Sequence, residues 1–256
     1  MADSRPRLSA TAAPLVSSGV CGDLRSALAW ISHAGFAGVQ LSATDPEMRP
    51  REMSGSARRD LAATLSRLEL ACSGIDFLIA AEHLLDPVHS TRAFDALCSV
   101  IEFAALLGRT PVTIPLAARE ACELRAAIAA RAERDGVPIL LSATEREDLP
   151  ALEAPFAASI DCAAVLGAGR DPVELVGVGG GRIGGVRVVD LLRSGLRGPI
   201  LEPRESRLDA LGLRIALETV GFNGLPVVDA RQWHAPDHGL ARTLARWNGL
   251  ISPTNA

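Results

Sequence analysis

Several short apolar runs of this 256-residue chain end in polar or charged residues whose types could support acid–base or anion-binding chemistry. A pair of carboxylates such as Asp161 and Asp229 is suited to moving a proton between a substrate and solvent. A guanidinium such as that of Arg187 can bind a carboxylate or phosphate through two parallel hydrogen bonds. The candidate site residues are Ser142, Asp161, Arg187, Asp190, Arg193 and Asp229.

A repeated strand–helix pattern predicts where these residues lie in the fold. Short apolar runs alternate with longer Ala-, Leu- and Arg-rich stretches that have helical period. The predicted strands cover residues 7–12, 38–43, 70–78, 111–116, 137–142, 156–161, 182–190 and 225–230. The predicted helices cover residues 23–34, 56–69, 91–107, 119–134, 145–152, a segment starting at 171, 205–220 and 236–247.

Eight such units in about 250 residues match a (β/α)8 TIM barrel, formed as one domain over residues 1–256. A doubly wound sheet is the alternative, although it needs fewer units. In a barrel, function lies at the C-terminal ends of the strands. We therefore expect the candidate residues to gather at that end, beneath the longest predicted loop, which follows the third strand.

The charge composition excludes several kinds of chemistry. All 26 basic residues are Arg, so Schiff-base, pyridoxal-phosphate, P-loop and protein-kinase mechanisms that need Lys are ruled out. The net charge of −4 gives no general attraction to nucleic acid or to an anionic membrane. No apolar run approaches the roughly 18 residues that span a bilayer. We expect a small-molecule ligand, with neither nucleic acid nor membrane as partner.

The five cysteines are widely separated and have no paired spacing, which favours a reducing compartment. We therefore expect a cytoplasmic protein. The Ala-rich helices leave room for a homo-oligomer interface, but nothing in the sequence identifies its surface.

Four segments together carry a family resemblance. DLRSALAWISHAGFAGVQL, TRAFDALCSVIEFAALLGRTPVTIP, DPVELV and LETVGFNGLPVVD follow one another in the order and spacing typical of sugar phosphate isomerase/epimerase proteins. The chain thus resembles that family over nearly its whole length. The resemblance implies a xylose isomerase-like TIM barrel and a sugar isomerase or epimerase activity.

The resemblance also implies a divalent metal, bound by Glu, Asp, His and Glu at the ends of strands five to eight. This chain departs from that pattern: Ser142 and Asp229 replace the two Glu residues, and Arg187 replaces the His, while Asp161 and Asp190 are kept. A guanidinium has no lone pair to offer a cation. We therefore expect the metal site to be largely lost, with no cofactor, and Asp161 and Asp229 as residual metal candidates.

Three functional hypotheses follow, and the sequence leaves open whether the protein is an enzyme. In the first, an isomerase-like protein binds a small polyhydroxy or anionic metabolite, such as a sugar, carboxylate or phosphate. Asp161 and Asp229 are then the acid–base groups, Arg187 is the anchor, and the remaining ligand contacts come from Ser142, Asp190 and Arg193.

In the second hypothesis, the protein is a catalytically inactive paralogue with a binding or assembly role. Arg187 then forms a buried salt-bridge plug with Asp161 and Asp229. In the third, metal catalysis persists with rearranged ligands such as Asp190 or Glu202.

Overall fold

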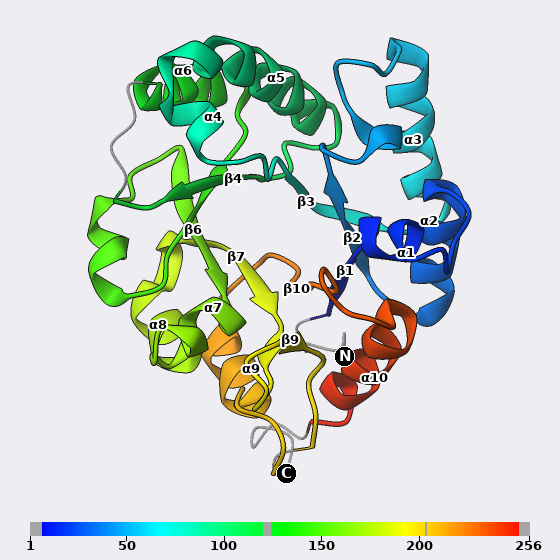
Figure 1. Ribbon diagram of the computed structural model, residues 1–256, viewed down its shortest axis with the longest axis vertical. Coiled ribbons are helices and arrows are strands. Elements are labelled where there is room, and N and C mark those ends of the chain that lie inside the picture. The colour runs from blue at the N-terminus through cyan, green and yellow to red at the C-terminus, as the bar shows by residue number, and fades with distance from the viewer. Residues whose placement is uncertain (1–6, 120–123, 203, 251–256) are drawn as a thin grey trace.

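Eight parallel strands close into a barrel in the order β1-β10-β7-β6-β5-β4-β3-β2 in the computed structural model, which describes residues 7–119, 124–202 and 204–250. The (β/α)8 barrel prediction is confirmed. The open doubly wound sheet was the wrong alternative, because β1 pairs with both β2 and β10 and leaves the barrel no free edge. Figure 1 shows the helices arranged around this ring of strands.

The barrel strands are short and lie close to the predicted runs. They are β1 Ser9–Thr11, β2 Gly38–Ser42, β3 Ala71–Asp76, β4 Val112–Ala117, β5 Ile139–Ser142, β6 Phe156–Asp161, β7 Ile183–Val188 and β10 Val227–Val228. The predicted seventh strand is too long, because its last residue leaves the barrel wall. Asp190–Leu191 forms β8, which pairs antiparallel with β9, Arg197–Gly198.

Six of the ten helices in the described part of the chain begin at a residue whose side chain caps them. Asp23 accepts a hydrogen bond from the Ser26 amide (2.7 Å) at the start of α2, and Gly35 ends this helix with φ 95°. The helices are α1 Ala13–Ser17, α2 Leu24–Ala34, α3 Gly55–Arg67, α4 Glu82–Leu85, α5 Pro87–Leu106, α6 Arg125–Asp135, α7 Cys162–Gly167, α8 Pro172–Gly179, α9 Ala210–Thr219 and α10 Pro236–Asn248. Short 3-10 turns cover η1 Pro46–Met48, η2 Arg146–Ala151 and η3 Gly180–Arg182.

Local capping also explains where the predicted helices were misplaced. The predicted loop after β3 contains α4, and α5 starts at Pro87 because Asp86 caps it through the Val88 amide (3.0 Å). The predicted helix over 205–220 starts only at 210, since Asp209 caps α9 through the Gly212 amide (2.9 Å). The predicted helix over 145–152 is the 3-10 turn η2. Residues 120–123 of the predicted helix over 119–134 lie outside the described residues.

The two faces of the barrel wall differ in polarity. Side chains such as Val39, Leu41 and Ile75 are fully buried in the hydrophobic core. The inside of the barrel instead carries many polar residues, among them Ser9 and Gln40. TIM barrels are usually filled by bulky branched side chains. Among the described residues, no helix has the length and apolar character needed to cross a membrane.

Candidate functional site

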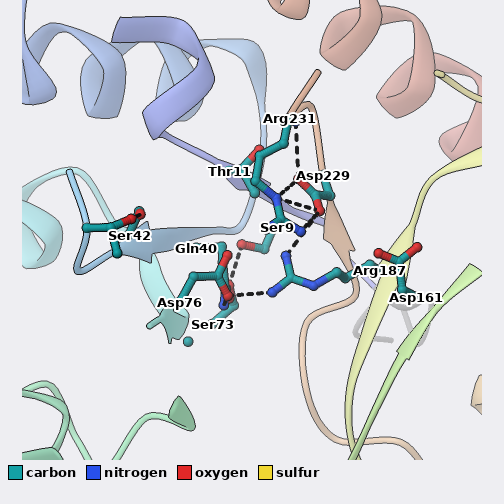
Figure 2. A network of polar contacts seen from close by, with 12 residues as sticks. Ser9, Thr11, Gln40, Ser42, Ser73, Asp76, Asp161, Arg187, Asp229 and Arg231 are labelled. Carbon is teal, nitrogen blue, oxygen red and sulfur yellow. Dashed lines mark hydrogen bonds and ion pairs between the residues drawn. The ribbon is translucent and has the colours of Figure 1, made fainter. Parts of the chain in front are cut away.

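Arg187 lies at the centre of a group of charged residues at the C-terminal ends of the strands. It comes from β7, is only 5% exposed, and reaches between Asp76 at the end of β3 and Asp229 just after β10 (Figure 2). Its Nη2 pairs with Asp76 Oδ1, and its Nη1 lies 3.3 Å from Asp229 Oδ2. Asp76 Oδ1 also accepts a hydrogen bond from Gln40 Nε2 at 2.8 Å. The guanidinium therefore spans the barrel from β3 to the end of β10.

Asp229 is the most heavily engaged carboxylate. It is fully buried and contacts two more arginines besides Arg187. Arg197 Nη2 lies 3.1 Å from its Oδ2. Arg231 Nε donates to Oδ1 at 2.8 Å and to Oδ2 at 3.0 Å, and Arg231 Nη2 also pairs with Oδ2. Both oxygens of Asp229 are thus occupied by guanidinium groups.

Asp161, at the end of β6, is bound by Arg197 of the β8–β9 hairpin. Arg197 Nη1 lies 2.8 Å from Oδ2 and 2.9 Å from Oδ1, so Arg197 bridges Asp161 and Asp229. Asp161 Oδ1 also accepts the Ala164 amide (3.2 Å) and caps α7. Three carboxylates and three guanidinium groups therefore compensate one another. We call this group the arginine–aspartate cluster: Asp76, Asp161, Arg187, Arg197, Asp229 and Arg231.

The cluster stabilises the charged forms of Asp229 and Arg187. Burial alone would raise the pKa of Asp229, but the charges of Arg187, Arg231 and Arg197 hold that pKa well below its usual range. Burial acts on Arg187 in the opposite sense, yet Asp76 and Asp229 raise the pKa of its guanidinium further. These groups are therefore charged across the physiological pH range.

The other predicted site residues lie apart from the cluster. Asp190 is fully buried, where it accepts hydrogen bonds from the amides of Leu191 (2.8 Å) and Leu208 (2.9 Å) and from the Ser206 hydroxyl (2.7 Å). Arg193 is exposed and donates to the Arg204 carbonyl at 3.1 Å.

Ser142 is exposed at the end of β5. Glu202 pairs with Arg246 of α10 at 3.2 Å. The structure therefore brings Asp161, Arg187 and Asp229 together but not Ser142, Asp190, Arg193 or Glu202. The ligand contacts expected of Ser142, Asp190 and Arg193 remain predictions.

The salt-bridge plug has a different membership from the predicted one. Arg187 pairs with Asp229 as predicted, but its second partner is Asp76 rather than Asp161. The sequence analysis assigned neither Asp76, the last residue of β3, nor Arg197, in the short β9, to the site. Arg231, two residues after Asp229, is a signal that could have been used, since a buried carboxylate needs a nearby cation.

A divalent metal does not fit this set of side chains. Arg187 has no lone pair, and both oxygens of Asp229 are directed at guanidinium hydrogens. Binding a cation would require Arg187, Arg197 and Arg231 to withdraw from the carboxylates that neutralise them. Among the described residues, no three His, Cys, Asp or Glu side chains are grouped so as to hold a metal ion.

Solved structures of low sequence identity share this architecture. D-allulose 3-epimerase from Methylomonas sp. superposes with a TM-score of 0.69 at 15% identity, over 96% of this chain and 98% of that one. A xylose isomerase domain protein from Planctomyces limnophilus gives 0.71 at 13% identity, over 96% and 97%. The probable 3-DHS dehydratase from Bacillus anthracis gives 0.68 at 12% identity, over 96% and 100%.

No family model and no curated protein matches the sequence. The structural likeness establishes the class of protein: the chain has the xylose isomerase-like (β/α)8 fold, as the resemblance implied. The solved structures that share this fold include sugar epimerases and a probable dehydratase.

Proposed function

We propose that this protein is a catalytically inactive relative of the xylose isomerase-like sugar epimerases and acts as a binding protein. The observation that carries the proposal is that every carboxylate in the arginine–aspartate cluster is paired with at least one arginine. In this account the cluster takes the place of the metal centre and stabilises the C-terminal end of the barrel.

The energetics of buried ion pairs support this view. Removing one partner from a buried pair leaves an uncompensated charge and costs roughly 3–5 kcal/mol. An incoming cation would have to separate the guanidinium of Arg187 from both Asp76 and Asp229, which are 3% and 0% exposed. The loss of these pairs opposes metal binding at this position.

Proton transfer is disfavoured for a related reason. A general base works best when its pKa lies near the working pH. The three arginines around Asp229 hold its pKa far below that range, so its carboxylate has little tendency to accept a proton. The alternative, in which Asp161 and Asp229 act as an acid–base pair on a sugar, requires an arginine to release each of them.

The fold neighbours suggest the class of ligand to examine. Their names refer to D-allulose, L-ribulose and 3-DHS chemistry. A scaffold derived from such proteins would bind a small polyhydroxy or anionic metabolite, while the chemical step would be lost.

Two measurements on the purified protein test the proposal. Calorimetric titration with Mn²⁺ should give no saturable heat, and D-allulose incubated in D2O should exchange no carbon-bound hydrogen beyond the buffer rate. The variant carrying S142E, R187H and D229E, which restores the donor types of the metal-dependent family, is the matched control for metal binding. Stoichiometric Mn²⁺ binding or protein-dependent exchange in the unmodified protein would contradict the proposal.

A further inference from the structure

A cavity opens at the opposite end of the barrel from the arginine–aspartate cluster. It has a volume of about 400 Å³. Its rim is formed by loops that precede strands, at residues 107–111 before β4, Pro138 before β5 and 223–225 before β10. Its inner end reaches Gln40 and Arg187, and Arg187 is itself a member of the cluster.

This cavity exists because the inner strand positions are small. Ser73, Ser159 and Gly185 line it at positions where TIM barrels usually carry bulky branched side chains. Ser73 is held in place by hydrogen bonds to Ser9 Oγ (2.7 Å) and Gln40 Oε1 (3.0 Å), as Figure 2 shows. The wall therefore combines hydrogen-bonded hydroxyl groups with apolar side chains such as Leu140 and Val227.

Two hydroxyl groups in the wall have no hydrogen-bond partner among the described residues. Thr113 and Ser159 line the cavity and are each only 6% exposed. Neither hydroxyl makes a hydrogen bond with any residue in the part of the chain that the structure describes. Both residues line the cavity, where water or a ligand can bond with their hydroxyls. One water occupies only about 30 Å³, so the cavity exceeds what one or two ordered waters fill.

The charges around the cavity favour an anion. Its lining contains two arginines and no carboxylate. Arg187 at the inner end already has Asp76 and Asp229 as partners. Arg109 at the rim is exposed and makes no ion pair with a described residue. Arg109 has φ 61°, and the Cδ and Nε atoms of its side chain lie against Gly136.

We propose that this cavity binds a small polyhydroxylated carboxylate, entering from the N-terminal face of the barrel. Arg109 pairs with the carboxylate at the rim, and the hydroxyls of Thr113 and Ser159 bond with hydroxyl groups of the ligand inside. The volume lies within the roughly 300–1,000 Å³ that is usual for small-molecule sites. This site is independent of the chemistry proposed for the C-terminal face.

The test uses a matched pair of probes in calorimetric titrations of the full-length protein. D-gluconate and D-sorbitol share a six-carbon polyol chain, but only gluconate carries a carboxylate. We expect saturable gluconate binding, with sorbitol binding about tenfold or more weaker, as expected for the loss of one charge-assisted contact.

Substitutions assign the binding to this cavity. Arg109→Met should weaken gluconate binding about tenfold and leave sorbitol unchanged, whereas Thr113→Val with Ser159→Ala should weaken both by about tenfold. Arg49→Met, in an exposed pair with Glu52 outside both sites, should affect neither. Failure of both probes to bind would overturn the proposal and leave a water-filled cavity. Binding that depends on Arg231 but not on Thr113 and Ser159 would also overturn it, and would place the ligand at the C-terminal face.

Discussion

Arg187 determines how the charges at the C-terminal end of the barrel are balanced. It is the one arginine of the cluster that contacts Asp76, and it shares Asp229 with Arg197 and Arg231. Its 5% exposure means that removing the guanidinium takes a buried partner from both Asp76 and Asp229. The resemblance equates Arg187 with a metal-binding His. In this chain, Arg187 supports the fold instead.

Replacing this guanidinium should destabilise the protein strongly. For Arg187→Met we expect a loss of about 3–5 kcal/mol in the free energy of unfolding, measured by urea denaturation, because Asp76 is left buried without a cation. The double variant Arg187→Met with Asp76→Leu should recover part of that loss. Arg49→Met, in an exposed pair with Glu52, is the control and should change stability by less than about 1 kcal/mol. A similar small effect for Arg187→Met would show that its pairs contribute little.

The pH dependence of stability should carry the signature of Asp229. Its pKa in the folded state lies below the value of about 4 in an unfolded chain, so its contribution is fully present above pH 4 and is lost as the pH falls further. We expect the difference in unfolding free energy between the wild type and Asp229→Asn to be constant from about pH 5 to 8. It should shrink below about pH 4. A difference independent of pH down to about pH 2 would mean that Asp229 is not stabilised as an anion in the folded protein.

Asp190 shows how one residue can organise an element. It follows β7, and its carboxylate holds the segment before α9 through the amides of Arg207 (3.2 Å) and Leu208 (2.9 Å) and the hydroxyl of Ser206. Asp190 is also the first residue of β8, which pairs with β9, and β9 carries Arg197. Asp190 therefore positions a member of the cluster without touching it.

Loss of this carboxylate should loosen the segment before α9. Asp190→Ala leaves the amides of Arg207 and Leu208 without acceptors, and each buried unsatisfied group costs about 1–3 kcal/mol. We expect lower stability together with faster amide hydrogen exchange over residues 204–209, while exchange in α3 is unchanged. Ser206→Ala removes one of the same contacts. It should cause a smaller loss of stability and a smaller increase in amide exchange over residues 204–209. Unchanged exchange over 204–209 would contradict this role.

The capping residues also show what can be read from local sequence. Asp23 and Gly35 bound α2 as predicted, because a cap is decided by residues within one turn of it. The start of α9 was misplaced, since Asp209 caps that helix while the segment before it is held by the distant Asp190. The hairpin of β8 and β9 has two residues in each strand, which is too short to produce an apolar alternation.

The fold of the whole chain could be predicted because each of the eight units carries its own signals, and only a few closed arrangements accommodate eight of them. The composition of the site could be predicted only in part. Asp161, Arg187 and Asp229 were identified from their strand ends, but the partner of Arg187 depends on which strands face one another across the barrel. That relation is set by strand register, which no local pattern of Asp76 reveals.

The N-terminal cavity is also a property of the whole molecule. It is formed by small residues on separate strands, such as Ser73, Ser159 and Gly185, and by loops from three places in the chain. Taken one at a time, each of these residues is unremarkable for a strand. Only the closure of the barrel brings these small inner residues together around one cavity.

Diffraction from crystals soaked in Mn²⁺ tests the central claim most directly, since anomalous scattering locates the ion. The account predicts no manganese peak between Asp161 and Asp229, with Arg187 still paired to Asp76 and Asp229 and Arg197 still bridging Asp161 and Asp229. A manganese ion bound by Asp161 and Asp229, with Arg187 and Arg197 turned away, would contradict it and restore a metal-dependent site.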